Sequence, residues 1–162
     1  MPVSPTLYRD AMARLGAAVN VVTSLGPEGR IGFTASAVCS VTDDPPTLLV
    51  CMNRDSLLNE AFKANGIFCV NVLAASQQAL SPLFAGFDGS PMEQRFAAAD
   101  WQAAATGAPV LMGAVASFDC RIAQVVEVGT HSVLFGEVLA ISEGASGEAL
   151  MYFRRTYHPI GT

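Results

Sequence analysis

The chain has 162 residues, of which 51% are hydrophobic and only 14% are charged, and its formal net charge is −5. This length is sufficient for one sizeable core, so we expect a single domain over residues 1–162. The negative charge and the presence of one lysine, Lys63, argue against a nucleic-acid-binding surface. The shortage of charged side chains indicates that another subunit covers part of the surface, so a homo-oligomer is expected.

The sequence also argues against a membrane span, a secreted protein and a structural metal. No apolar run approaches the length of a membrane-spanning helix. The first residues include Arg9, Asp10 and Arg14 and lack the pattern of a secretory signal, so we expect a cytoplasmic protein. The four cysteines are widely spaced in apolar runs without a CxxC pair, which favours buried, reduced thiols and no zinc site.

Helix and strand signals follow one another in a pattern that is rich in strands. Ser4-Pro5 is typical of a helix start, because Ser caps free N–H groups and Pro fits the first turn. Phe118, Cys120 and Ile122 alternate with polar residues, as in a half-buried antiparallel strand. The elements expected in chain order are helix 5–15, strand 18–24, a strand from residue 31, strand 47–52, a short helix ending at Gly66, strand 67–73, helix 76–87, a helical turn near 92–99 within a loop-like 88–108, and strands 116–125, 131–141 and 149–153.

These elements predict a mainly β protein with short helices, of the α+β class. Six or seven strands joined by hairpins favour a closed or nearly closed antiparallel barrel. Strict strand–helix alternation is missing, and this disfavours a doubly wound parallel sheet.

The segment GFTASAVCSVTDDPP, residues 32–46, carries no charge before Asp43. If it forms one strand, one face carries Phe33, Ala35, Ala37, Cys39 and Val41, and the other carries Thr34, Ser36, Val38, Ser40 and Thr42. The hydroxyl face could bind a flat heteroaromatic ligand, because small side chains allow close approach and hydroxyls donate hydrogen bonds. An edge strand that carries Thr and Ser for their β propensity explains the same pattern, and the residues alone leave both interpretations open.

Three further segments are candidate ligand sites. Asn53-Arg54-Asp55-Ser56 lies where a strand ends and a helix begins, a place where free N–H groups attract phosphate, although plain helix capping explains it equally well. His131 follows a Gly-Thr turn, and residues 152–158 contain two arginines and two tyrosines. A local hydrogen bond would also explain His131, and contact with solvent would also explain the two arginines. The sequence contains neither a dinucleotide fingerprint nor a phosphate loop.

Together, the order and spacing of these segments resemble the short-chain flavin reductases of two-component monooxygenases, which have an FMN-binding split β-barrel. The likeness covers nearly the whole chain, from LYRDAMARLGAAVNVVTS through GFTASAVCSVTDDPPTLLVCMNRDS, FCVNVL, FAG and RF to VGTHSVLFGEV and YFRRTYHP. It implies Greek-key antiparallel strands, a homodimer, and an NAD(P)H:flavin oxidoreductase that supplies reduced FMN or FAD to a separate monooxygenase. Hydride transfer from nicotinamide to flavin is cofactor chemistry, which explains why the sequence offers no catalytic acid or base.

By position, the resemblance also implies a role for individual residues. His131 is the implied catalytic residue, beside the nicotinamide. Asp55, Leu57 and Leu58 stand where some family members carry a second hydroxyl or a lysine, so the phosphate contacts are the least defined. The implied contacts are Thr34, Ser36 and Ser40 (side chains) and Ala35 and Cys39 (backbone) to the flavin ring; Asn53, Arg54 and Ser56 to its phosphate; Phe84, Ala85, Gly86, Arg95 and Phe96 near its tail; and His131, Tyr152, Arg155, Tyr157 and His158 near the pyridine nucleotide.

Two other functions are compatible with the same barrel. One is a flavin-binding protein without NADH turnover, and the other is an oxidase acting on a phosphorylated pyridoxine vitamer. A nicotinamide site at His131 and residues 152–158 would distinguish the reductase, because a flavin-storage protein has no need of one. The sequence does not distinguish FMN from FAD, NADH from NADPH, or bound flavin from flavin that is released.

Overall fold

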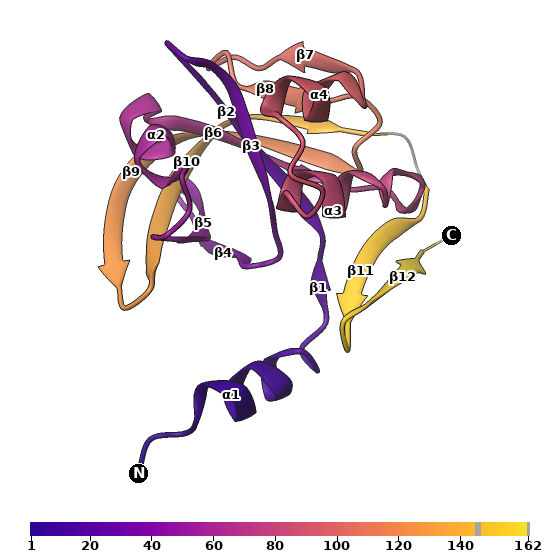
Figure 1. Ribbon diagram of the computed structural model, residues 1–162. Helices are drawn as coiled ribbons and strands as arrows, with labels where there is room; N and C mark the ends of the chain where they lie inside the picture. Colours follow the sequence, from indigo (N-terminus) through magenta and orange to yellow (C-terminus); the bar gives the residue numbers. More distant parts are fainter. Residues whose placement is uncertain (145–146, 162) are drawn as a thin grey trace.

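The computed structural model describes residues 1–144 and 147–161. Its centre is a seven-stranded antiparallel sheet with the order β3-β2-β6-β9-β10-β5-β4, curled into a barrel (Figure 1). These strands are β2 (Asn20–Gly26), β3 (Gly29–Ala35), β4 (Val38–Asp43), β5 (Pro46–Asn53), β6 (Ile67–Val72), β9 (Ala116–Val128) and β10 (His131–Glu143). The mainly β, nearly closed barrel is therefore confirmed.

The barrel is open between its two edge strands, β3 and β4. These strands are consecutive in the chain, yet within the described residues neither pairs with the other, and β3 instead approaches β5 across the opening. Around the rest of the barrel, the hairpins β2–β3, β4–β5 and β9–β10 set the register. The long opening between β3 and β4 is called the seam below.

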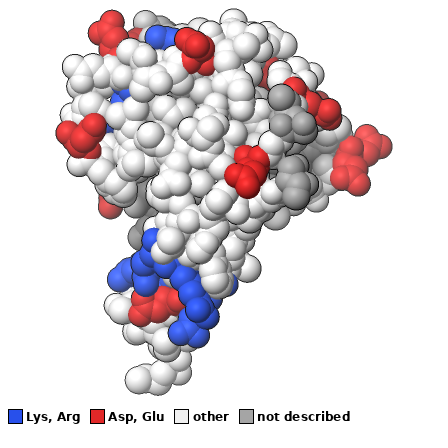
Figure 2. Space-filling view, turned by 90° about the vertical axis from the view of Figure 1, so that its right-hand side faces the viewer, with Lys and Arg blue, Asp and Glu red and all other residues white. Residues whose placement is uncertain are grey.

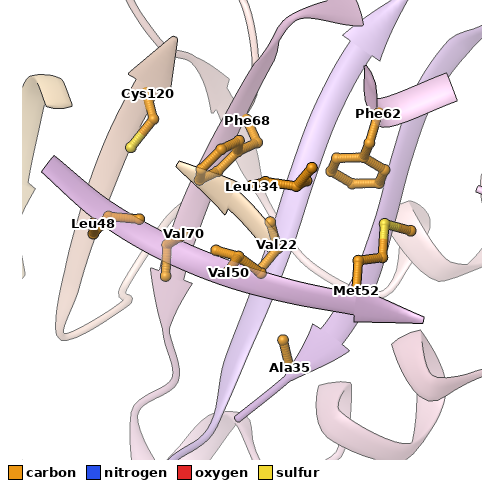
Figure 3. Close-up of a cluster of buried hydrophobic side chains, with 10 residues drawn as sticks. All are labelled: Val22, Ala35, Leu48, Val50, Met52, Phe62, Phe68, Val70, Cys120 and Leu134. Atoms are coloured by element: carbon orange, nitrogen blue, oxygen red, sulfur yellow. The ribbon is translucent and has the colours of Figure 1, made fainter. Parts of the chain in front are cut away.

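The core of the barrel is formed by side chains from alternate strand positions. Leu48, Val50 and Met52 of β5 point inward, as a period of two requires. They meet Phe68 and Leu134 from β6 and β10 (Figure 3). This apolar packing explains why the Val- and Leu-rich runs form strands here, since burial of apolar surface is the main favourable contribution to folding.

In the part of the chain that the structure describes, five helices and two small sheets surround the barrel. A second core cluster, which includes Phe84, Phe96, Leu111 and Leu150, lies under the helices of the middle segment. The helices are α1 (Pro5–Met12), α2 (Asn59–Asn65), the 3₁₀ helix η1 (Ala75–Gln77), α3 (Leu80–Ala85) and α4 (Met92–Ala97), and the smaller strands are β1 (Ala17–Ala18), β7 (Trp101–Ala103), β8 (Pro109–Leu111), β11 (Ala149–Phe153) and β12 (Thr156–Ile160). None of the described helices has the length and hydropathy that crossing a membrane would require.

The N-terminal arm, residues 1–18, projects away from the barrel (Figure 1). None of the residues of α1 is buried. The arm is held at its base by β1, which pairs with β11, and by hydrogen bonds to the β11–β12 hairpin. Its helix therefore contributes almost nothing to the core of its own chain.

The prediction of one continuous strand over residues 32–43 was wrong. The strand ends at Ala35, and the Val38 N–H donates to the Ser36 carbonyl over 2.9 Å, which closes a three-residue turn. The turn reverses the predicted faces, so that Val38 packs against the core while Cys39 and Val41 are exposed. No Gly or Pro marks this break in the sequence.

Several smaller predictions also need correction. The first helix ends at Met12 instead of residue 15, and the helix expected over 76–87 is two short pieces, η1 and α3. Strands β7, β8 and β12 were not predicted. Burial of the thiols holds for Cys69 and Cys120, whereas Cys39 is exposed and Cys51 is half-buried.

Candidate functional site

A cavity of about 770 Å³ lies at the seam of the barrel. Ser36, Cys39 and Cys51 line it together with apolar side chains such as Leu49 and Phe118. No charged residue is among the described residues of its wall. Burial, and to a smaller degree the neighbouring Cys39, raises the pKa of the Cys51 thiol, which keeps the thiol neutral. The cavity is therefore large and uncharged, and part of its wall is made of small side chains such as Ser36 and Ala37. These are the properties that a binding site for a flat heteroaromatic ring requires.

Two smaller cavities adjoin the seam and share residues with it. Thr34 and Ser36 line a cavity of about 180 Å³ that also involves Ala85, whereas Cys39 and Ser40 line one of about 440 Å³. Thr34 Oγ1 donates to the Ser81 carbonyl over 2.5 Å, so this hydroxyl already has a partner. The predicted ring contacts thus lie around one region, and only part of the row faces any single cavity.

The C-terminal hairpin, β11–β12, forms the far wall of the 180 Å³ cavity. Tyr152 and Tyr157 face each other with ring centroids 5.1 Å apart, and both line the cavity. Tyr157 shares a hydrogen bond of 2.7 Å with Ser81 Oγ. His158 lies further along β12, with its ring 6.2 Å from that of Phe153. Two aromatic rings and a hydroxyl pair therefore border the smaller cavity.

The turn between β11 and β12 is made by Arg154 and Arg155, whose φ angles are +50° and +60°. Left-handed backbone is unusual for residues other than Gly, Asn and Asp. The Arg154 N–H donates to the Ala13 carbonyl over 2.6 Å, and Arg155 pairs with Asp10 over 2.7 Å. The turn thus fastens the base of the arm.

Positive charge is concentrated on the arm and this turn. Figure 2 shows basic side chains gathered on the projecting part of the molecule and acidic side chains spread over the body. Residues 1–18 and 149–161 hold four of the nine basic residues, at positions 9, 14, 154 and 155, and one of the fourteen acidic ones, Asp10. The arm is therefore electropositive although the whole chain is acidic.

The turn that follows β5 lies beside the start of β10. Asn53 and His131 are direct partners across the two strands, so the structure brings the expected phosphate and nicotinamide residues together. His131 is exposed, and its Nδ1 is 2.9 Å from Thr130 Oγ1. Asn53 Oδ1 accepts from the Asp55 N–H, and Ser56 Oγ accepts from the Leu58 N–H. Two of the three predicted phosphate contacts therefore also stabilise the local turn.

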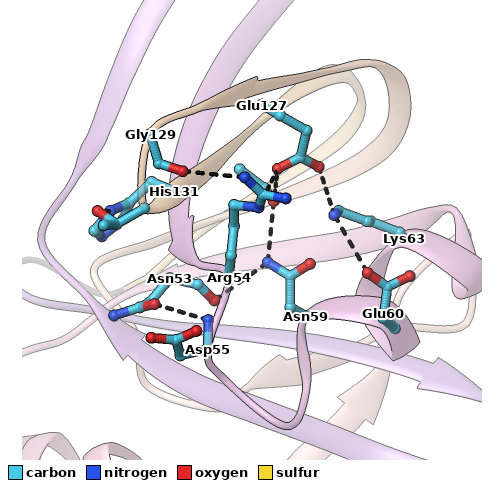
Figure 4. Close-up of polar contacts among 11 residues, drawn as sticks. Asn53, Arg54, Asp55, Asn59, Glu60, Lys63, Glu127, Gly129 and His131 are labelled. Carbon is cyan, nitrogen blue, oxygen red and sulfur yellow. Dashed lines mark hydrogen bonds and ion pairs between the residues drawn. The ribbon is translucent and has the colours of Figure 1, made fainter.

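A polar cluster that the sequence analysis missed surrounds Arg54 (Figure 4). Glu127, near the end of β9, accepts from Lys63 over 2.6 Å and from Ser132 over 2.8 Å, and pairs with Arg54 over 3.2 Å. Asn59 donates to the buried Ser132 hydroxyl. An isolated acidic residue in a strand gives no sequence motif, and only the three-dimensional contacts identify Glu127.

Two of the residues expected near the flavin tail, Phe84 and Phe96, lie in the core. Phe84 and Phe96 are 1% and 2% exposed and meet edge to face, with centroids 5.2 Å apart. Arg95 donates to the Ser90 carbonyl and lies over Gly86, whose φ of +80° ends α3. The side chains of the two phenylalanines cannot reach a ligand, so any contact from them must come from their backbone.

The structure does not bring all of the predicted nucleotide contacts together. His131 lies beside the turn at the tip of the β9–β10 hairpin, whereas Tyr152, Arg155, Tyr157 and His158 belong to the β11–β12 hairpin. Figure 1 places these two hairpins on opposite sides of the molecule. Within one chain, the contacts expected for the pyridine nucleotide are therefore divided between two locations.

Comparison with known proteins adds independent information. The family model described as "Flavin reductase like domain" matches residues 12–161. A curated relative from Ancylobacter novellus, named FMN reductase (NADH) RutF, is 61% identical over 158 residues, which cover 98% of this chain and 86% of the relative. BorF, the flavin reductase component of a bacterial two-component tryptophan halogenase, matches with a TM-score of 0.91 and 30% identity, covering 98% of this chain and 99% of BorF. SgcE6, an NADH:FAD oxidoreductase of Streptomyces globisporus solved with NAD and FAD fragments, matches with a TM-score of 0.89 and 29% identity, covering 99% and 97%.

Proposed function

This chain belongs to the family of flavin reductase like domains, and on that basis we propose that it is an NADH-dependent reductase of FMN that supplies reduced flavin to a separate monooxygenase. The name of the RutF relative includes both FMN and NADH. BorF is the flavin reductase component of a two-component halogenase. The structural observation that carries the proposal is the uncharged cavity at the seam, beside the residues expected at the flavin ring.

The ring of the flavin would lie in the seam cavity. Ser36 can donate a hydrogen bond there, and the small Ala37 and Cys39 leave room for a flat ligand. Thr34 contributes indirectly, because its hydroxyl is bonded to the Ser81 carbonyl and fixes α3 against β3. Hydride transfer is supplied by the nicotinamide and the flavin themselves, so these residues need only bind and orient the rings and exclude water.

The phosphate of FMN would lie at the turn after β5. The Cys51 N–H donates to the Ala37 carbonyl over 3.0 Å, which places Cys51 beside the seam. Asn53 follows two residues later, about 7 Å further along the strand. A ligand with its ring at the seam and its phosphate at Arg54 therefore lies along the end of β5 and the turn that follows it. This arrangement suits the elongated shape of FMN.

A homodimer is part of the proposal. The helix α1 has eight residues, none buried, and exposes the apolar side chains of Leu7, Tyr8 and Met12. Helices this short are marginal in water without packing, so a second copy that covers α1 would explain why it forms. Light scattering of the purified protein tests this, and a monomer at micromolar concentration would rule it out.

The location and the acceptor are also proposed. NADH is an intracellular metabolite, so the protein is expected to act in the cytoplasm. The reduced flavin is expected to leave the site, because the seam cavity offers its ring few polar contacts and no charged one. A monooxygenase that binds reduced FMN would then receive it by diffusion.

Anaerobic mixing of the protein with NADH and an excess of FMN tests the proposed activity. If the protein is a reductase, each protein molecule reduces many molecules of FMN, and the absorbance of oxidised flavin disappears. A flavin-storage protein reduces none, and this result would refute the proposal. Repetition with NADPH in place of NADH establishes which nucleotide is preferred.

A further inference from the structure

We propose that Glu127 is a positioning residue that holds Arg54 and Lys63 in place to recognise the phosphate of FMN. This inference rests on the proposed function. It names a residue to which the sequence analysis gave no role, and the contacts of that residue are specific enough to test.

Glu127 is the centre of the polar cluster beside the β5 turn (Figure 4). Its Oε1 accepts from Lys63 Nζ over 2.6 Å, and its Oε2 lies 3.2 Å from Arg54 Nε. Its Oε2 also accepts from Ser132 Oγ over 2.8 Å. The hydrogen bonds from Lys63 and Ser132 hold the pKa of Glu127 below its usual value, while Glu127 raises the pKa of Lys63. Both groups are therefore charged at neutral pH.

The contacts leave part of the Arg54 guanidinium available. Nε lies 3.2 Å from Glu127 Oε2, and Nη1 donates to the Gly129 carbonyl over 3.1 Å. Nη2 has no hydrogen-bond partner among the described residues, and the side chain is 53% exposed. An exposed arginine normally samples many rotamers and loses this conformational entropy when it binds an anion. The contacts with the anion must then offset the entropy that is lost. Glu127 removes much of this cost, because it holds the side chain before the ligand arrives.

The cavity at this cluster has a volume of about 380 Å³. Arg54 and Lys63 are the only basic residues among the described residues that line it. Two like charges at one site repel each other, and the carboxylate of Glu127 allows both to face the same space. Asp55 and Glu60 also line the cavity, so its net charge does not favour an anion. Recognition must therefore come from the placement of individual donors.

The same carboxylate is connected to the strand that carries His131. Ser132, which follows His131, is fully buried and is bonded to both Glu127 and Asn59. Asn59 in turn donates to the Asn53 carbonyl over 3.2 Å. The phosphate turn, α2 and the start of β10 are thus joined through one hydrogen-bonded chain, which gives the site a fixed geometry.

Binding of FMN and riboflavin to Glu127→Gln and Glu60→Gln tests the inference. The two flavins share a ring, and only FMN carries the phosphate. Both substitutions remove one negative charge that contacts Lys63, but only Glu127 also contacts Arg54. If charge alone mattered, both variants would bind FMN more tightly. Positioning predicts that Glu127→Gln weakens FMN binding by about 3- to 10-fold, as expected for freeing one or two long side chains, and that riboflavin binding stays within about 2-fold.

A double substitution separates positioning from a general structural role. If Glu127 acts through Arg54, then Glu127→Gln should have much less effect on FMN binding when Arg54→Gln is already present. Additive effects would overturn the inference, as would equal loss of FMN and riboflavin binding or tighter FMN binding by Glu127→Gln. Riboflavin binding also reports whether each variant is folded. Failure of the wild-type protein to oxidise NADH with any flavin would instead refute the proposed function.

Discussion

Replacement of Arg154-Arg155 by Asn-Gly should stabilise the fold and at the same time weaken NADH binding. The turn holds two consecutive residues at φ +50° and +60°. A two-residue hairpin turn with both angles positive strongly prefers Asn-Gly, because glycine has no Cβ to clash and the short polar side chain of asparagine tolerates left-handed backbone. Arginines at both positions therefore indicate that their side chains are retained for another reason.

The size of the effect follows from three contributions. Relief of left-handed strain at two positions stabilises by roughly 1–2 kcal/mol per residue at most. The greater freedom of glycine in the unfolded chain offsets about 0.5–1 kcal/mol. Loss of the exposed pair between Arg155 and Asp10 offsets up to about 1 kcal/mol more. The net gain is about 1 kcal/mol, or about 2–4 °C in the midpoint of thermal unfolding for a chain of this size.

Thermal unfolding and NADH kinetics measured on the same preparation test this reasoning. The variant should unfold at a higher temperature and show a raised KM for NADH, because Arg155 is expected near the pyridine nucleotide. Asp10→Asn is the matched control, since it breaks the same ion pair and leaves the turn unchanged. A lower unfolding midpoint for the Asn-Gly variant would refute the argument from strain. An unchanged KM for NADH would remove Arg155 from the nucleotide site.

Four further predictions concern the core, the ring site, the nicotinamide site and pH. Gly136→Ala should destabilise the protein by about 1–3 kcal/mol in urea unfolding, because a Cβ there would clash with the ring of Phe68; an unchanged midpoint would contradict this packing. Ser36→Trp should abolish flavin binding in a fluorescence titration by filling the seam cavity, and unaltered binding would mean that the ring lies elsewhere. His131→Ala should raise the KM for NADH more than that for FMN, and the reverse order would count against its assignment. Because the pKa of Glu127 is lowered, its stabilising effect is present above its unfolded value of about 4 and is lost as pH falls through the folded value. The difference in the free energy of unfolding between wild type and Glu127→Gln should therefore be constant near neutral pH and disappear in acid. A difference that persists in acid would contradict this assignment.

The sequence predicted the barrel because its strands are strongly patterned. Runs such as residues 47–52 and 67–73 are rich in β-branched and apolar residues, and alternate positions of β5 are buried as expected. The break at Ser36-Ala37 was not predictable, because the turn there contains no Gly or Pro and is closed by one local hydrogen bond. Strand β12 was missed for a related reason, since Arg154-Arg155 is not a typical turn sequence.

The candidate site was only partly predictable. The structure places Asn53 opposite His131, so two motifs that are far apart in the sequence lie side by side in the fold. Phe84 and Phe96 are buried in the core, so the packing of their side chains alone explains why the chain carries them. The role proposed for Glu127 was not predictable from the sequence, because it arises from contacts with Lys63 and Arg54, two residues that are distant along the chain.

The central claim is that the protein transfers hydride from NADH to free FMN, with the ring held at the seam. Steady-state oxidation of NADH, measured at a catalytic protein concentration while FMN is varied, tests it most directly. The account predicts a rate that rises and saturates with FMN and that falls sharply in Ser36→Trp. A rate that does not respond to added FMN would contradict it.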